Sequence, residues 1–244
     1  LLFVQGANSM IFQLGKTEEE RRMLINSTGR KWEFTFTTLV TFGGAFFASF
    51  PLFYSTSFGG AYWVWVLILF TFIIQAISYE FQNKARNLFG VRTFQTGLII
   101  NGILGPLLLG GAVATFFTGS NFIVEKGNIT DFMQPVISHW ANGSRGLDVL
   151  LNPWVVIFGI SVVFLARILG TLYINNNVND DIIRGRVRKQ LLVNTVLFLL
   201  FFLPFLIVTL VGEGYAVNEA GVIVMEPMKY LNNLLAMWPL AIIL

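Results

Sequence analysis

Long apolar stretches separated by short polar segments dominate the pattern of this 244-residue chain. A stretch of about 20 apolar residues is long enough to cross a bilayer as an α-helix. Backbone groups in lipid must find their hydrogen bonds within the segment, so helices are the expected form. The pattern predicts about seven transmembrane helices: a partial one at residues 1–15, full ones at 33–56, 60–82, 94–118, 152–176 and 191–212, and one that begins near residue 231.

The predicted fold is therefore an all-α integral membrane protein, a polytopic helix bundle that forms one transmembrane domain over residues 1–244. Two local patterns predict additional structure. Residues 215–224 alternate around an Asn/Gly turn and predict a short β-hairpin. Thr17 followed by Glu20 predicts a capping box at the start of a short helix. Both ends of the sequence lie in apolar stretches, so we expect it to be a fragment of a longer membrane protein.

Composition supports a membrane location. The chain is 55% hydrophobic and 12% charged, with a mean hydropathy of +0.69. Soluble domains carry about 25% charged residues. With half that share and 25 Phe residues, this chain has too little polar surface to cover a soluble globule. Its main solvent is therefore expected to be lipid.

Basic residues gather in three of the predicted loops, at residues 16–31, 83–93 and 177–190. Loops rich in Lys and Arg stay on the cytoplasmic side of a membrane. The three loops fall on one side if the span count is correct, so we expect all three to be cytoplasmic. The net charge of +3 is small and no basic run alternates with aromatic residues, so the expected partner is the lipid bilayer and not nucleic acid.

Polar residues inside a predicted span are candidates for function, because placing them in lipid is costly. Glu33, Thr37 and Thr41 recur every four residues and therefore lie on one face of their helix. This stripe rises from the predicted cytoplasmic side with a carboxylate at its foot, and it predicts a proton pathway. The accessory polar positions are Gln5, Asn8, Glu80 and Trp32.

Each of these positions also has a simpler interpretation. Glu33 at a helix N-terminus is favoured by the helix dipole whether or not it moves protons. Rows of Thr and amide side chains join helices in membranes more often than they conduct. Trp32 fits an interfacial anchor better than a ligand-stacking residue. Glu80, near the end of its predicted span, fits a solvated charge.

The sequence offers few ligands for a redox centre. Haem iron is held by His, Met, Cys or Tyr, and the sole histidine, His139, lies in a predicted loop. There is no cysteine, and the six Met residues are scattered in a way that is typical of core packing. We therefore expect no metal site and no cofactor bound directly by this chain.

Several short motifs occur in order and resemble one known family. They are Glu20-Arg21-Arg22 with Asn26-Ser27, then Lys31-Trp32-Glu33, the segment at residues 43–54, Tyr79-Glu80-Phe81, Gly105-Pro106-Leu107 and Asn152-Pro153. The series resembles subunit II of the cytochrome bd quinol oxidases.

The resemblance implies an eight-helix, haem-free subunit in the bacterial cytoplasmic (inner) membrane. It implies a partner, subunit I, which carries haems b and d and the quinol site, and a small accessory subunit. The complex oxidises quinol, reduces dioxygen to water and takes its protons from the cytoplasm. The acid after the Trp in the second helix is associated with proton uptake in the family, and by position that acid is Glu33.

The chain departs from the family pattern at three polar positions. Gln5 and Asn8 stand where the family has acids, and Gln75 stands where it has an arginine. A proton path through acids of the first helix is therefore not expected, and Glu33 remains the main candidate. Two other interpretations stay open: a secondary transporter, which would require a broken helix or an inverted repeat, and a purely structural membrane subunit.

Overall fold

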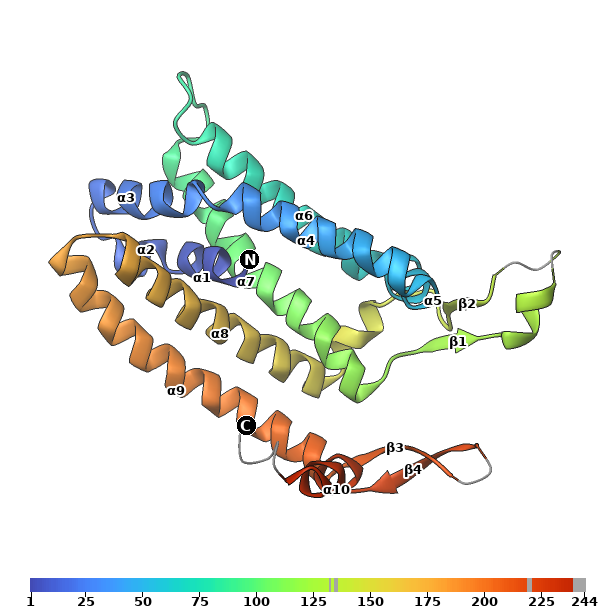
Figure 1. Cartoon of the computed structure of the whole chain (residues 1–244). Helices are drawn as coiled ribbons and strands as arrows, with labels where there is room; N and C mark the ends of the chain where they lie inside the picture. Colours follow the sequence, from blue (N-terminus) through green and yellow to red (C-terminus); the bar gives the residue numbers. More distant parts are fainter. Residues whose placement is uncertain (132, 134–135, 219–220, 239–244) are drawn as a thin grey trace.

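The computed structural model describes residues 1–131, 133, 136–218 and 221–238, and helices dominate it (Figure 1). The four longest are α6 (Tyr62–Phe81), α7 (Val91–Thr118), α8 (Pro153–Asn177) and α9 (Asp181–Val211). The shorter α-helices are α1 (Leu2–Ser9), α2 (Ile11–Leu14), α3 (Glu18–Gly29), α4 (Trp32–Ser49), α5 (Pro51–Tyr54) and α10 (Lys229–Ala236). A π-helix, η1 (Ser55–Gly60), follows α5, and two 3₁₀ turns are η2 (Lys126–Thr130) and η3 (Leu147–Leu151).

Two short antiparallel strand pairs complete the fold. Strand β1 (Phe122–Val124) pairs with β2 (Ser138–Trp140), and β3 (Glu213–Val217) pairs with β4 (Ile223–Pro227). The second pair confirms the hairpin predicted at residues 215–224. The capping box is also confirmed, because Thr17 Oγ1 accepts from the Glu20 backbone N–H while Glu20 Oε2 accepts from the Thr17 N–H.

The predicted count of seven transmembrane helices is not confirmed. Within the described residues, four helices are long and apolar enough to cross a membrane, namely α6, α7, α8 and α9. The first predicted span is divided at Met10 into the short helices α1 and α2. The second is divided at Phe50, before Pro51, and its first part, α4, which contains Glu33 and four threonines, is not among the four candidate spans. The predicted seventh span begins as α10, and its last residues, 239–244, lie outside the described part of the chain.

The interpretation of residues 177–190 as a loop was wrong. Helix α9 begins at Asp181, ten residues before the predicted start of the apolar span, and only residues 178–180 separate it from α8. The Asp180 side chain caps the new helix by accepting from the Ile183 N–H at 2.9 Å. Arg and Lys are good helix formers, so the helix continues through the charged segment.

Helix α8 lies at the centre of the bundle and packs against α1, α7 and α9. The contact with α1 is unusually close. A Cβ added at Gly6 would lie 1.7 Å from the Ala166 carbonyl oxygen, and one added at Gly170 would lie 2.3 Å from the Ala7 nitrogen. Small residues let helix backbones approach in this way, and dispersion then replaces the hydrophobic effect as the source of stability in lipid.

The two ends of the bundle differ, as Figure 1 shows. At one end, α3 and the start of α9 enclose an apolar cluster that includes Leu24, Ile174 and Ile183. The other end carries both strand pairs. There the Asp148 carboxylate accepts hydrogen bonds from Asn121, Trp140 and Ser144 at 2.7, 3.0 and 2.5 Å. Burial alone would raise the pKa of Asp148, but these hydrogen bonds outweigh it and lower the pKa.

Candidate functional site

The predicted polar stripe lies on the surface of α4. Glu33, Thr37 and Thr41 are all exposed, and Thr35 is the buried residue of this helix. Thr37 Oγ1 donates to the Glu33 carbonyl at 2.9 Å, and Thr41 Oγ1 donates to the Thr37 carbonyl at 3.0 Å. The Glu33 carboxylate has no ion pair within the described residues. The structure therefore keeps the three residues on one face and leaves that face open.

Two aromatic side chains of α4 contact rings of α6. Trp32 stacks on Tyr79 with ring centroids 5.6 Å apart, and Phe36 packs on Phe72 at 5.0 Å. Trp32 thus lies against a neighbouring ring. Glu80 forms an exposed ion pair with Lys84 at 2.7 Å, one helical turn away. Such solvated pairs contribute little to stability, so the structure supports the simpler interpretation of Glu80 as a solvated charge.

Gln5 and Asn8 have a very different environment, because both are fully buried. Gln5 Nε2 donates to Gln75 Oε1 at 2.9 Å and approaches Asn101 Oδ1 at 3.5 Å. Gln5, Gln75 and Asn101, from α1, α6 and α7, have no exposed surface and form what we call the amide cluster. The sequence identified Gln5 as a polar position within a span and Gln75 as a departure from the family pattern, but it carried no signal that the two meet each other or Asn101.

A second contact extends the polar interior toward α3. The Tyr79 hydroxyl donates to Asn8 Oδ1 at 2.7 Å and lies 2.9 Å from Thr28 Oγ1. Asn8 lies one turn from Gln5 on α1, and Tyr79 lies one turn from Gln75 on α6. The amide cluster and this triad therefore follow the same two helices toward the α3 end of the bundle. In the amide cluster and this triad, the Tyr79 phenol is the one ionisable side chain.

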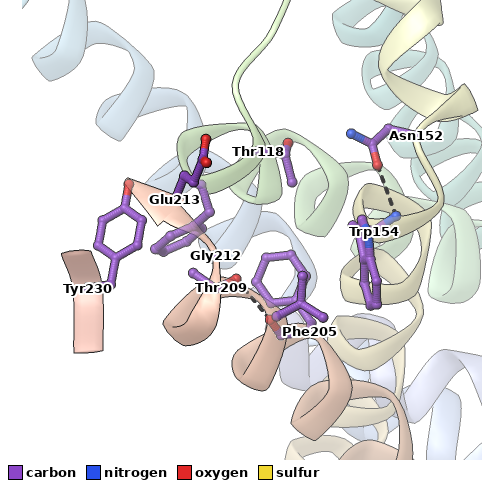
Figure 2. Close-up of a pocket in the computed structure, with 10 residues that line it drawn as sticks. Thr118, Asn152, Trp154, Phe205, Thr209, Gly212, Glu213 and Tyr230 are labelled. Carbon is purple, nitrogen blue, oxygen red and sulfur yellow. Dashed lines mark hydrogen bonds between the residues drawn. The ribbon is translucent and has the colours of Figure 1, made fainter. Parts of the chain in front are cut away.

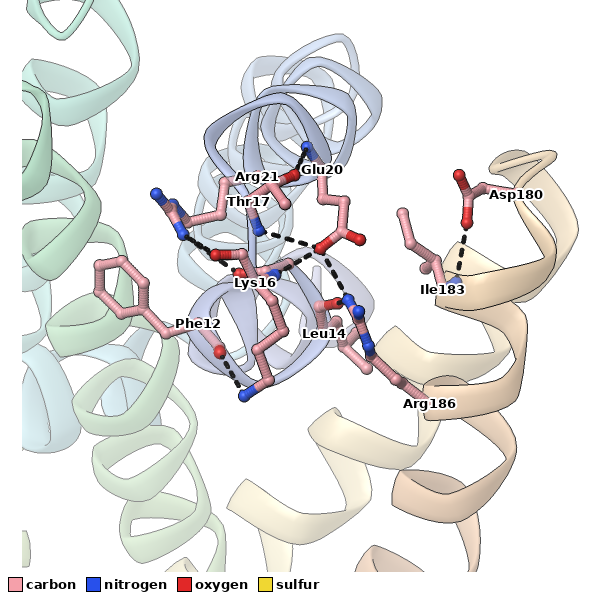
Figure 3. Close-up of polar contacts among 10 residues, drawn as sticks. Phe12, Leu14, Lys16, Thr17, Glu20, Arg21, Asp180, Ile183 and Arg186 are labelled. Atoms are coloured by element: carbon pink, nitrogen blue, oxygen red, sulfur yellow. Dashed lines mark hydrogen bonds and ion pairs between the residues drawn. The ribbon is translucent and has the colours of Figure 1, made fainter.

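Figure 3 shows the polar contacts that join α3 to α9. Glu20 Oε2 accepts from Arg186 Nη1 at 2.7 Å and from the Lys16 N–H at 2.5 Å. Arg186 Nη1 also donates to the Leu14 carbonyl at 2.7 Å. The hydrogen bond from Arg186 and then that from the Thr17 N–H lower the pKa of Glu20 to about 2. Sequence reasoning found the capping role of Glu20 and missed its partner on a distant helix.

A cavity of about 250 Å³ lies at the strand-bearing end of the bundle (Figure 2). Its wall combines aromatic rings of Trp154, Phe205 and Tyr230 with the polar residues Thr118 and Glu213. Two other polar groups on its wall are engaged locally. Asn152 Oδ1 caps α8 by accepting from the Trp154 N–H, and Thr209 Oγ1 donates to the Phe205 carbonyl. None of the predicted site residues lines this cavity.

Ligands for a metal do not come together in the described ranges. Among these residues there is no group of three or more His, Cys, Asp or Glu side chains placed to hold a metal ion. His139 is exposed on β2, at the end of the bundle opposite α3.

Two kinds of polar group among the described residues can exchange protons or form hydrogen bonds. Glu33 is an exposed carboxylate at the foot of a hydroxyl stripe, and it can take up and release a proton. The amide cluster is buried and can only donate and accept hydrogen bonds. The structure thus places Glu33 on the surface and the amide cluster in the interior, although Glu33 and Gln5 were both predicted as polar positions within spans.

Comparison with known proteins gives a consistent result. The family model described as "Cytochrome bd terminal oxidase subunit II" matches residues 1–244. The chain is similar to "Cytochrome bd-I ubiquinol oxidase subunit 2" of Escherichia coli (strain K12), with 26% identity over 81% of this chain and 50% of the relative. It is also similar to "Probable cytochrome oxidase subunit 2" of Haemophilus influenzae, with 26% identity over 89% and 54%. For "Cytochrome bd ubiquinol oxidase subunit 2" of Bacillus subtilis the identity is 26% over 72% and 48%. The chain thus spans about half the length of the curated relatives that it matches.

Proposed function

The chain belongs to the cytochrome bd terminal oxidase subunit II family, and we propose that it is the haem-free second subunit of a membrane quinol oxidase. In this proposal subunit I carries haems b and d and oxidises quinol, and a small accessory subunit completes the complex. The chain supports subunit I in the bacterial cytoplasmic membrane. The absence of a second histidine from the sequence supports a redox role for the partner alone.

The exposed face of α4 is the observation that supports a membrane partner. This helix presents a carboxylate and two threonine hydroxyls on its surface, and lipid is a poor environment for a carboxylate. Exposed aromatic side chains, including Phe34, Phe42 and Phe47, lie on the same helix. A protein surface that covers α4 would bury these rings and enclose the stripe in a polar or hydrated seam.

We propose that this seam carries protons from the cytoplasm, with Glu33 as the group that takes them up. Residues four apart on a helix are separated by about 6 Å along its axis, which is too far for direct hydrogen bonds between the hydroxyls. Each threonine hydroxyl donates to its own helix and keeps lone pairs that accept from water. Water molecules between Glu33, Thr37 and Thr41 would therefore complete the pathway. The loops at residues 16–31, 83–93 and 177–190 are cytoplasmic in this arrangement, with 181–190 forming the first turns of α9.

The test is Glu33→Gln in the assembled oxidase, with oxygen consumption and the haem absorption spectrum as readouts. The substitution keeps the size and polarity of the side chain and removes its proton exchange, so turnover should fall several-fold while haem content stays unchanged. Glu80→Gln is the matched control, since Glu80 is also an exposed carboxylate near a helix end. Unchanged turnover in Glu33→Gln would remove this residue from the pathway.

A purely structural role is the second candidate, and it is supported by the hydroxyls of α4. Both threonine hydroxyls of the stripe donate within their own helix, as they would in a helix without any conducting role. The two functions differ in one measurable respect. A structural subunit would tolerate Glu33→Gln without loss of turnover, but its removal would release or destabilise the haem-bearing partner.

A further inference from the structure

The amide cluster has more hydrogen-bonding groups than its own contacts satisfy. Gln5 Oε1, Gln75 Nε2 and Asn101 Nδ2 are buried and have no hydrogen-bond partner within the described residues. Asn8 Nδ2, one turn along α1 from Gln5, is also buried and without a hydrogen-bond partner within the described residues. Buried polar atoms without a partner are rare, because the desolvation of the group is then uncompensated.

The number of amide atoms without a hydrogen-bond partner does not depend on which way the amide groups are oriented. If all three amides are reversed, Gln5 Oε1 accepts from Gln75 and Asn101, and the same two contacts are kept. The atoms left without a partner are then Gln5 Nε2, Gln75 Oε1 and Asn101 Oδ1. Either orientation leaves one end of each amide unpaired, so exchanging the amide oxygen and nitrogen positions does not supply the missing partners.

The backbone of α7 leaves room beside one of these atoms, Asn101 Nδ2. A Cβ added at Gly105 would have Asn101 Nδ2, Gln5 Cγ and Thr71 Oγ1 as its nearest neighbours, at 3.5, 3.7 and 3.8 Å. These are ordinary van der Waals distances, so the glycine leaves a methyl-sized space next to two polar atoms. The Thr71 hydroxyl donates to the Ile68 carbonyl at 2.7 Å and keeps lone pairs that accept a further hydrogen bond.

We propose that the amide cluster is a water-binding site inside the α1–α6–α7 bundle, with at least one ordered water held between Gln5, Gln75 and Asn101 beside Gly105. Water is the ligand whose chemistry fits, because it both donates and accepts and so pairs an amide oxygen and an amide nitrogen together. Buried waters typically make about three hydrogen bonds to groups that are otherwise unsatisfied. The proposal does not depend on the route of proton uptake or on the face that contacts a partner.

Two substitutions distinguish a hydrated cluster from a dry one in the complete oxidase. Gly105→Ala adds a methyl that fits sterically, so in a dry cluster the melting temperature stays equal or rises. In a hydrated cluster the same methyl displaces water, and the melting temperature falls. Asn101→Leu removes both an unpaired donor and the 3.5 Å contact with Gln5. In a dry cluster these two effects oppose each other and the melting temperature changes little, whereas in a hydrated cluster the water also loses a partner and the melting temperature falls.

Ser161→Ala is the matched control, because Ser161 is equally buried and donates to the Phe158 carbonyl within its own helix. It should change the melting temperature little in either case. Both cluster variants are expected to melt at a lower temperature than the parent and the control. A melting temperature equal to or higher than that of the parent for either cluster variant would overturn the proposal.

A direct measurement keeps the proposal testable even if a variant fails to fold. An electron cryo-microscopy map of the unmodified oxidase in lipid nanodiscs should show water density at about 3 Å from Asn101 Nδ2 or Oδ1 and from the Gln5 amide. A map that resolves ordered water elsewhere in the bundle and shows none in contact with the three amides would refute the site.

Discussion

Helix α4 and the interior formed by α1, α6 and α7 both carry polar side chains inside predicted spans, but these side chains differ in exposure and in hydrogen-bond partners. On α4 the carboxylate and hydroxyls are exposed, and the hydroxyls bond to their own helix. In the interior, Gln5, Asn8 and Gln75 are fully buried and bond between helices. The exposed group is ionisable, and the buried amides are not.

The difference separates two uses of polarity in a membrane protein. A carboxylate that remains at the surface can exchange protons with water or with a partner's seam. Amides that are buried between helices hold a bundle together without a charge to desolvate. The family pattern that the sequence resembles implies acids at Gln5 and Asn8 and an arginine at Gln75, and the amides found here carry no charge. Because Gln5 and Gln75 are in direct contact, an acid and an arginine at these two positions would form an ion pair.

The largest predicted effect comes from restoring a charge to the interior. Gln75→Arg alone buries a cation without a counter-ion and should destabilise the protein by about 3–5 kcal/mol. Adding Gln5→Glu supplies the counter-ion across the 2.9 Å contact, so the double variant should recover a substantial part of this loss. The measurement is a double-mutant cycle on melting temperature and yield of the assembled complex. Simple additivity of the two single losses would show that the residues do not interact.

The next effect concerns the close packing that brings Gln5 and Asn8 into the interior. Gly6→Ala places a methyl 1.7 Å from the Ala166 carbonyl, so α1 must move away from α8 at a cost of about 3 kcal/mol. Gly185→Ala is the control, because a Cβ there meets no atom within 4 Å. Differential scanning fluorimetry should show a large fall in melting temperature for Gly6→Ala and almost none for Gly185→Ala. Equal melting temperatures would contradict the tight α1–α8 contact.

A smaller effect is expected where α3 is joined to α9. Glu20→Gln loses the ion pair with Arg186 and should cost about 1–3 kcal/mol, whereas Glu19→Gln changes an exposed residue and should cost little.

The same contact predicts a pH dependence. The folded pKa of Glu20 lies below its ordinary value of 4.5, at about 2, so its stabilisation is complete above pH 4.5 and is lost as the pH falls toward 2. The acid dependence of melting should weaken in Glu20→Gln and persist in Glu19→Gln. An identical dependence in both variants would exclude Glu20 as its source.

The smallest effect is expected at the strand-bearing end. Asp148→Asn replaces an acceptor of several hydrogen bonds with a group that has one acceptor atom, so the segment around β2 should loosen locally. Hydrogen exchange at residues 138–148 should rise while the melting temperature changes little. Asp181→Asn, at a side chain that is 99% exposed, is the control. Unchanged exchange in Asp148→Asn would mean that this carboxylate does not order the loop.

Hydropathy predicted three of the four long helices well, because α6, α7 and α8 begin and end close to the apolar stretches. Hydropathy failed where a helical segment is not apolar, or where an apolar segment is not one continuous helix. The first turns of α9 are charged yet helical, and α1 is apolar yet interrupted at Met10. Local chemistry was readable where the partners are close in sequence, as in the Thr17–Glu20 capping box and the β3–β4 hairpin.

The partners of the buried polar residues could not be predicted in the same way. Gln5 lies 70 residues from Gln75, and Glu20 lies 166 residues from Arg186. These contacts depend on how glycines let helices approach and on where α9 begins, which are properties of tertiary packing. The stripe of Glu33, Thr37 and Thr41 was predicted from its four-residue period, and its role in proton uptake remains a prediction.

The length of α9 has a consequence for how the subunit sits in its membrane. At about 1.5 Å per residue, its 31 residues span about 46 Å, whereas the hydrocarbon core of a bilayer is about 30 Å thick. Its charged first turns, with Arg186 bound to Glu20, therefore project beyond the hydrocarbon. Movement of α9 along the membrane normal into the hydrocarbon core would bring this ion pair into lipid. A change in bilayer thickness would then be met by helix tilt, because tilt leaves the ion pair outside the hydrocarbon.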